Sequence, residues 1–161
     1  MMDIPALNMP PARLDIRRSG SHSEVYDSLR RRWVTLTPEE WVRQHFVGWL
    51  TGELGYPASL AANEVGLKLN GTLRRCDTVI YDRSLHPLVV VEYKAPSVTI
   101  SQKVFDQIAR YNFVLHARAL MVSNGMDHYC CVYCPDGSYR FLPGIPAYCR
   151  LTEILHSLDS R

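Results

Sequence analysis

The chain has 161 residues, of which 47% are hydrophobic and 21% charged, and its formal net charge at pH 7 is +2. This length fits one domain, and the composition is that of an ordinary globular protein, which excludes disordered and fibrous classes. No apolar run approaches the ~20 residues that cross a bilayer. The N-terminus also lacks the basic-then-apolar pattern of a signal peptide. We therefore expect a cytoplasmic protein with no membrane partner, and the weak positive charge alone gives no argument for nucleic acid.

The N-terminal part, residues 1–29, is expected to be a lead-in to the folded domain. Three prolines fall within its first eleven residues, which favours a loosely docked segment, and residues 12–18 are expected to form a short strand. The run Arg30, Arg31 and Arg32 follows. It has two interpretations: a solvated surface, or a phosphate contact, because arginine offers paired donors to phosphate oxygens.

A helix is predicted from Thr37 to about residue 51. Thr37 is a good N-cap, a proline follows it, and Glu40 stands where a capping box needs an acid. At about 100° per residue, Glu40 falls opposite the apolar stripe and Glu39 falls nearer the interior. His45 lies within the stripe and is expected to be a packed core residue.

Three strands are predicted next. Residues 63–69 alternate in polarity and end at an Asn-Gly pair, which is typical of a hairpin turn. Arg74 and Arg75 lead into a second strand, residues 76–82, which contains Asp77; these arginines contact phosphate or remain solvated. The third strand, residues 88–94, ends in Glu92 and Lys94, which share one face by alternation.

The connection between the second and third strands is short, so the two strands are expected to pair antiparallel and to bring Asp77 beside Glu92. Charges at the end of a core strand are costly unless they are paired, bound to a metal or open to a cleft. A helix from residue 101 to about 116 follows, in which Gln107 and Tyr111 are i,i+4 neighbours. The next strand, residues 119–123, should return parallel to residues 88–94. A last hairpin and a C-terminal helix complete a predicted α/β fold with a mixed central β-sheet flanked by helices.

Asp77, Glu92-Tyr93-Lys94 and Gln107-x-x-x-Tyr111 together resemble the layout of PD-(D/E)XK nucleases, in their RecB-like branch. With residues 37–44, 105–112 and 123–125, the chain is similar to the N-terminal nuclease domain of type I restriction enzyme R subunits, over about residues 30–148. The resemblance implies a restriction-endonuclease-like core in residues 30–150, with residues 151–161 as a C-terminal helix or tail.

The resemblance implies Mg²⁺-dependent hydrolysis of DNA phosphodiester bonds, with Mn²⁺ as a plausible substitute. Asp77, Glu92 and the backbone carbonyl of Tyr93 would hold the metal, which prefers hard oxygen ligands. Lys94 would position water or phosphate, and Glu39 is the candidate for a further metal ligand from the first helix, the alternative being that it only favours the helix N-terminus. The remaining implied site residues are Gln107 as a catalytic residue, Tyr111 as its support, and Arg30, Arg31, Arg32, Arg74 and Arg75 as DNA contacts.

Other interpretations stay open. Asp77, Glu92 and Lys94 form either this site or a buried ion-pair network, and the chain is either a nuclease or a non-catalytic nucleic-acid-binding or partner-docking module. Type I R subunits carry an ATP-driven motor, but this sequence has no G-x-x-x-x-G-K-[ST] loop, so no ATP site is expected. A motor or specificity subunit would then be a separate protein. An RNA substrate and a homodimer are also open.

Five cysteines occur, three of them at Cys130, Cys131 and Cys134. They contain one C-x-x-C pair, with His128 and Cys149 nearby, whereas zinc ribbons need two such pairs. Alternation along a strand sends Cys130 and Cys131 to opposite faces. We therefore expect reduced, small core residues, with zinc binding and redox chemistry as alternatives.

Overall fold

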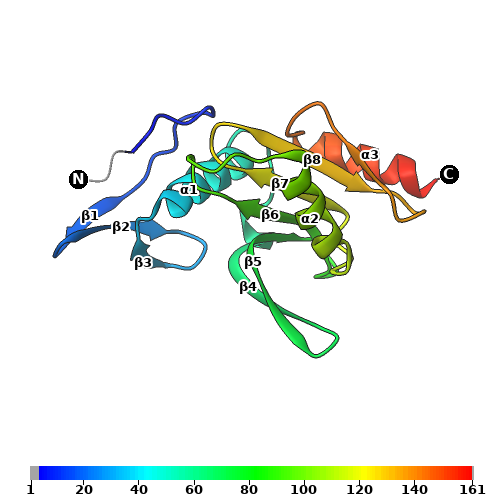
Figure 1. Ribbon diagram of the computed structural model, residues 1–161, viewed down its shortest axis with the longest axis horizontal. Coiled ribbons are helices and arrows are strands. Elements are labelled where there is room, and N and C mark those ends of the chain that lie inside the picture. Colours follow the sequence, from blue (N-terminus) through cyan, green and yellow to red (C-terminus); the bar gives the residue numbers. More distant parts are fainter. Residues whose placement is uncertain (1–3, 161) are drawn as a thin grey trace.

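The computed structural model describes residues 4–160, apart from the side chain of Leu69. In this part of the chain a mixed six-stranded sheet forms the centre of the molecule (Figure 1). Its strands, in spatial order, are β4 (Ala61–Leu69), β5 (Thr72–Tyr81), β6 (Pro87–Tyr93), β7 (Ala119–Ser123), β8 (His128–Tyr133) and β9 (Tyr139–Phe141). Strands β6 and β7 pair parallel and all other neighbours antiparallel, as the sequence predicts.

Helices cover both faces of this sheet. One face packs against α1 (Pro38–Thr51) and α3 (Tyr148–Asp159), whose Phe46 and Leu151 lie in one core with Val89 and Val91 of β6. The other face packs against α2 (Gln102–Phe113), and a short 3-10 helix, η1 (Ala58–Leu60), precedes β4. Removing these apolar side chains from water is the main driving force for the fold. The predicted mixed sheet flanked by helices is confirmed.

A second, smaller sheet precedes α1 in the chain. It consists of β1 (Ile16–Ser19), β2 (His22–Asp27) and β3 (Arg32–Thr35), all antiparallel (Figure 1). The strand expected at residues 12–18 therefore begins four residues later than predicted. Residues 1–3 of the expected lead-in and residue 161 of the expected tail lie outside the described residues, and the domain limits at residues 29 and 151 stay predictions.

Several local signals determine where the elements begin and end. The Thr37 hydroxyl accepts a hydrogen bond from the Glu40 N–H (3.1 Å), and Ser101 caps α2 in the same way. Asn70 (φ 48°) and Gly71 (φ 80°) form the β4–β5 turn with two positive φ angles, as an Asn-Gly hairpin requires. Helix α2 ends three residues before the predicted position. Across residues 4–160, none of the helices combines the length and hydrophobicity that a bilayer crossing needs.

Candidate active site

Strands β5 and β6 separate where their acidic residues begin. Their antiparallel pairing extends to Thr78, opposite Val91. Beyond this pair, the backbone N–H of Tyr93 donates to the carboxylate Oδ2 of Asp77 (2.9 Å). A backbone carbonyl would normally accept this bond within an antiparallel ladder. The Asp77 side chain therefore takes the place of backbone, and it points toward the end of β6.

The carboxyl groups of Asp77 and Glu92 lie together at this point. Burial and, after it, the neighbouring charge of Asp77 raise the pKa of Glu92 to about 7, against the opposing effect of the Arg74 guanidinium. The Glu92 side chain is only 13% exposed. Two acids in such an arrangement disfavour each other's ionised form, and a cation would relieve the repulsion. The predicted proximity of the Asp77 and Glu92 ends of the strands is thus present.

One cation already contacts Glu92. The guanidinium Nη2 of Arg74 donates to Glu92 Oε1 (2.6 Å), and Arg74 Cζ lies 3.4 Å from the centroid of the Tyr111 ring. Tyr111 is 45% exposed and reaches the acids only through this arginine. Gln107, one turn earlier on α2, is exposed and makes no hydrogen bond from its amide within residues 4–160. Arg74 therefore belongs to the acidic cluster rather than to the open surface.

Lys94 lies directly after β6 on the side of the chain that Glu92 occupies. Its backbone N–H donates to the Ser123 carbonyl (2.9 Å), which fixes the main chain at this position. The side chain is half-buried, and in the described part of the chain its ammonium makes no ion pair or hydrogen bond. Its position directly after the strand that carries Glu92 and its lack of an ion-pair partner in the described residues leave the ammonium available to a ligand.

The expected orientation of the first-helix acids is wrong. Glu39 is exposed, whereas Glu40 is 6% exposed and accepts hydrogen bonds from Arg30 and from the Gln44 amide (3.2 Å). The Thr37 cap forms, but the Glu40 carboxylate turns to Arg30 and Arg43. The prediction considered only the apolar stripe of α1. It omitted the charged side chains from β2–β3 and from α1 itself that cover the opposite side of its first turn.

Arg43 is a residue of the site that the sequence reasoning missed. Its guanidinium donates to the backbone carbonyl of Asp77 (3.2 Å) and to Glu64 Oε1 (2.5 Å), and it lies 3.2 Å from Glu40 Oε2. Burial alone would lower the pKa of Arg43, but the nearby charges of Glu40 and Glu64 raise it overall. An arginine three residues after an acid on a largely buried helix is the signal that could have found it. Arg43 connects α1 to the strand that carries Asp77.

A chain of buried polar side chains joins the small sheet to the same strands. Asn63 donates to Asp27 Oδ2 (2.9 Å) and accepts from the Thr78 hydroxyl (2.6 Å), and the Tyr93 hydroxyl donates to Thr78 Oγ1 (2.9 Å). Asp27 also accepts hydrogen bonds from the backbone and the guanidinium of Arg30. These partners come from segments far apart in the sequence, so no local pattern could reveal them.

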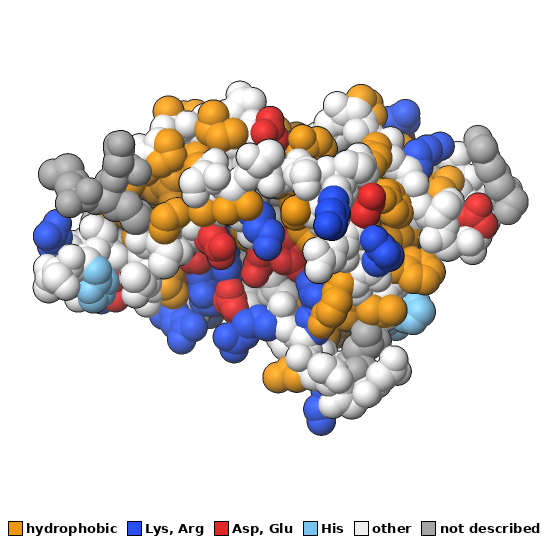
Figure 2. Space-filling view, in the orientation of Figure 1, with side chains coloured by type: hydrophobic (Ala, Val, Ile, Leu, Met, Phe, Trp, Pro, Cys, Tyr) orange, Lys and Arg blue, Asp and Glu red, His pale blue; other side chains and the backbone are white. Residues whose placement is uncertain are grey.

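The other arginines predicted to contact DNA differ in how far their side chains are exposed to solvent. Arg30 is turned inward toward Asp27 and Glu40. Arg31 and Arg32 are exposed, and the Arg75 side chain is 73% exposed and 3.4 Å from Glu64. Figure 2 shows acidic side chains gathered at the centre of this face with basic side chains around them. Arg31, Arg32 and Arg75 are thus the members of this group that face solvent.

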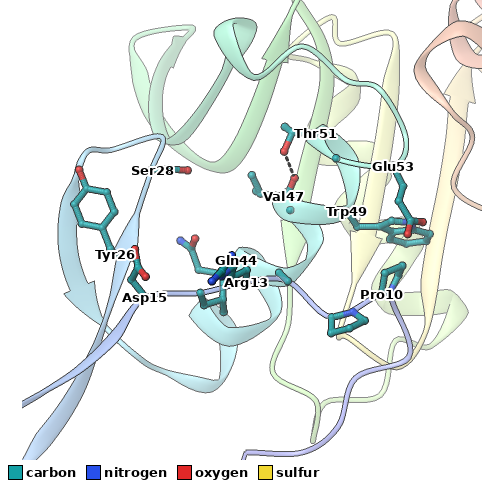
Figure 3. A pocket seen from close by; sticks show the side chains of 15 residues that line it. Pro10, Arg13, Asp15, Tyr26, Ser28, Gln44, Val47, Trp49, Thr51 and Glu53 are labelled. Carbon is teal, nitrogen blue, oxygen red and sulfur yellow. Dashed lines mark hydrogen bonds between the residues drawn. The ribbon is translucent and has the colours of Figure 1, made fainter.

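Two hollows adjoin the region. One of about 500 Å³ lies beside the site and is lined by Glu40, Arg43, Glu64 and residues of β3. Another of about 470 Å³ lies between residues 10–15, β2 and α1. Figure 3 shows Tyr26 on the β2 wall of this cavity, with Gln44 and Val47 on the α1 wall. Asp77, Glu92 and Lys94 line neither hollow; the first adjoins them through Arg43, whose guanidinium donates to the Asp77 carbonyl.

Four of the five cysteines lie on or after β8, whereas Cys76 directly precedes Asp77 on β5, where burial and the nearby charge of Glu92 raise the pKa of its thiol. Cys130 and Cys131 are buried in opposite cores, as alternation predicts, and burial raises the pKa of each thiol to about 12. All five cysteines are free. Within residues 4–160, no three His, Cys, Asp or Glu side chains lie close enough to hold a metal ion. The Asp77–Glu92 pair nevertheless suits Mg²⁺, which takes one or two carboxylates and completes its shell with water and phosphate oxygens.

The comparisons with known proteins agree with this geometry. A family model described as the type I restriction enzyme R protein N terminus matches residues 38–146. This chain belongs to that family. The matched range includes both acids, Lys94, Arg43 and Tyr111, whereas Asp27 and Arg30 precede it. The resemblance seen in the sequence to R protein N-terminal domains is thereby confirmed.

A solved structure shares the fold of this R protein N-terminus family member. It is the fragment structure of a putative HsdR subunit of a type I restriction enzyme from Vibrio vulnificus YJ016, with a TM-score of 0.59 and 19% sequence identity. The alignment covers 78% of this chain and 26% of that chain, so the present chain spans about a quarter of its length. A search of curated proteins found no match.

Proposed function

We propose that this chain hydrolyses DNA phosphodiester bonds with Mg²⁺, or Mn²⁺ in its place, on a restriction-endonuclease-like PD-(D/E)XK core formed by residues 30–150. The observation that carries the proposal is the meeting of Asp77 and Glu92 where β5 and β6 separate, with the pKa of Glu92 raised to about 7. Membership of the R protein N-terminus family supports a nuclease in particular.

The acids and the Tyr93 carbonyl supply the metal-binding oxygens. Mg²⁺ bound there would neutralise phosphate charge and lower the pKa of an attacking water. Lys94, whose ammonium is free of protein partners in the described residues, contacts the phosphate or the water. Gln107, which is exposed on α2, is proposed to orient water or backbone phosphate. Glu39 faces solvent on the first turn of α1, so we do not include it among the metal ligands.

Glu40 acts through another residue. Together with Glu64 it holds Arg43, and Arg43 in turn holds the Asp77 carbonyl. The exposed cations Arg31, Arg32 and Arg75 are proposed to contact DNA phosphates around the acids. Other subunits of a restriction enzyme are proposed as partners.

The test is a supercoiled-plasmid nicking assay with Mg²⁺, with Mn²⁺ and with EDTA. We expect metal-dependent nicking by the wild type and none by Asp77→Asn or Lys94→Ala. Glu153→Gln, which removes an exposed acid on α3, is the matched control and should nick normally. Circular dichroism checks that each variant is folded. Nicking at the wild-type rate by both site variants would contradict the proposal.

A second candidate is a nucleic-acid-binding module without turnover. It is favoured by the position of Arg74, whose guanidinium is hydrogen-bonded to the Glu92 carboxylate. This candidate predicts DNA or RNA binding that persists in EDTA and weakens steeply with salt, because phosphate contacts release counterions. Binding measured by fluorescence anisotropy, together with the nicking assay, separates the two candidates.

A further inference from the structure

The Arg74 guanidinium lies between the Glu92 carboxylate and the Tyr111 ring. It donates to Glu92 Oε1 at 2.6 Å, and its Cζ is 3.4 Å from the Tyr111 centroid. The Arg74 and Glu92 side chains are 16% and 13% exposed. Arginine stacks readily on an aromatic face while pairing with a carboxylate. Its charge therefore has two partners, one on β6 and one on α2.

The hydrogen-bond donors of Arg74 are not all satisfied at this position. The Nε of Arg74 is buried and has no hydrogen-bond partner in the described residues. Buried donors without partners are rare and need an explanation. The contact to Glu92 is a single hydrogen bond rather than the paired one that the two group geometries allow. Arg74 is thus close to Glu92 without satisfying its own donors.

No other cation takes over the charge of Glu92 here. Arg43 lies near Asp77 but bonds its backbone carbonyl and the carboxylates of Glu64 and Glu40. Lys94 makes no ion pair within residues 4–160. Removal of Arg74 would therefore leave Asp77 and Glu92 facing each other with only solvent to compensate them.

We propose that Arg74 is a placeholder cation, which occupies Glu92 in the absence of a divalent metal and is displaced when the metal binds. This inference rests on the metal site of the proposed function. A guanidinium and a divalent cation repel each other and compete for the same oxygen. The Tyr111 ring, which is partly open to solvent, keeps the displaced guanidinium beside the acids.

Two consequences follow for the metal. Its affinity is reduced by the competition with Arg74, and its binding releases a positive charge next to the place where a phosphate would lie. Tyr111 affects metal affinity through Arg74 alone, which makes it a positioning residue. Its hydroxyl has no hydrogen bond with the described residues, so only the ring is needed.

Isothermal titration of the full chain with Mn²⁺, without DNA, tests this directly. We expect Arg74→Gln to bind Mn²⁺ roughly fivefold more tightly than the wild type, the scale of one ion pair. Arg150→Gln is the matched control, because it removes the same charge from a largely exposed side chain on α3. It should bind as the wild type does. Tyr111→Leu should strengthen Mn²⁺ binding, whereas Tyr111→Phe should leave it unchanged.

A second measurement is made on the wild type, with the variant used only for assignment. The Nε–Hε resonance of Arg74, assigned by its loss in Arg74→Gln, should shift when Mg²⁺ is added. An unmoved resonance at saturating Mg²⁺ would overturn the placeholder role. Equal Mn²⁺ affinity in wild type and Arg74→Gln would overturn it too, as would an equal gain in Arg150→Gln, which would indicate a net-charge effect.

Asp77→Asn distinguishes this failure from failure of the proposed function. If Asp77→Asn abolishes Mn²⁺ binding while Arg74→Gln leaves it unchanged, the metal site is supported and the placeholder role of Arg74 is overturned. If Asp77→Asn binds Mn²⁺ as the wild type does, the metal site itself is wrong, and the placeholder is overturned with it.

Discussion

Two charged clusters lie side by side on the strands of this protein, and they differ in how completely their charges are compensated. In the first, Asp27 accepts hydrogen bonds from Asn63, Arg30 and the backbone. Burial would raise the pKa of Asp27, but these hydrogen bonds outweigh it and lower the pKa overall. In the second cluster, burial and the charge of Asp77 raise the pKa of Glu92 to about 7.

The difference indicates two uses of buried charge. The Asp27 cluster joins the small sheet to the main sheet, and nearly every polar atom in it has a protein partner. The Asp77–Glu92 cluster places like charges together and leaves a buried donor of Arg74 unsatisfied. Perturbed and poorly compensated groups of this kind are typical of sites that bind a ligand. The first cluster should therefore be needed for stability and the second for activity.

The largest expected effect is loss of the first cluster. Asp27→Ala leaves the Asn63 amide without its acceptor and Arg30 with Glu40 as its remaining acidic partner, so we expect the free energy of unfolding to fall by about 3–5 kcal/mol. Urea unfolding monitored by circular dichroism measures this. Glu24→Ala, which removes a partly exposed acid of the same strand, should cost less than about 1 kcal/mol. Equal losses in the two variants would remove the contrast on which the comparison rests.

A smaller loss is expected from the middle of the buried polar chain. Thr78→Val keeps the shape of the side chain but leaves the Asn63 Oδ1 and the Tyr93 hydroxyl without a partner. The expected cost is about 1–3 kcal/mol, the usual penalty for a buried group that loses its hydrogen bond. Thr152→Val, at a half-buried position of α3, serves as control in the same unfolding experiment. An unchanged free energy of unfolding in Thr78→Val would mean that these buried hydrogen bonds do not contribute to stability.

In the second cluster, substitution of an acid should raise the free energy of unfolding rather than lower it. Without divalent metal, Asp77→Asn removes one of two repelling charges and still offers an oxygen to the Tyr93 N–H. We expect a gain in unfolding free energy of up to about 1 kcal/mol together with loss of nicking, the trade-off common at active sites. Thermal unfolding in EDTA measures the first and the plasmid assay the second. A loss of stability comparable to that of Asp27→Ala would contradict the assignment of Asp77 to a ligand site.

The smallest effect concerns acid stability. The pKa of Asp27 is lowered by folding, so its contribution is fully present above its unfolded pKa, about 3.9, and is lost as the pH falls through the lower folded value. Asp27→Asn should therefore flatten the decline of stability below about pH 4 relative to the wild type. Urea midpoints measured at closely spaced acidic pH values show this slope. Parallel declines in both proteins would rule out Asp27 as a contributor.

Much of the fold could be read from local patterns. The Asn-Gly turn, the hairpin that brings Asp77 to Glu92 and the parallel return of residues 119–123 depend on neighbouring residues and standard strand geometry. The orientation of Glu40 could not be read in this way, because it depends on Arg30 from a separate sheet. The position of Arg74 depends on the separation of β5 from β6, and no pattern of residues predicts that separation.

The Asp27 and Arg30 contacts have a consequence for how this region can be cut or transplanted. The range shared with the R protein N-terminus family begins at residue 38, yet both residues precede it. A fragment trimmed to the shared range would expose Glu40 and Asn63 without their partners. Any graft of this unit onto another protein would therefore have to bring the β2–β3 turn along, or supply a substitute acid and guanidinium at the same place.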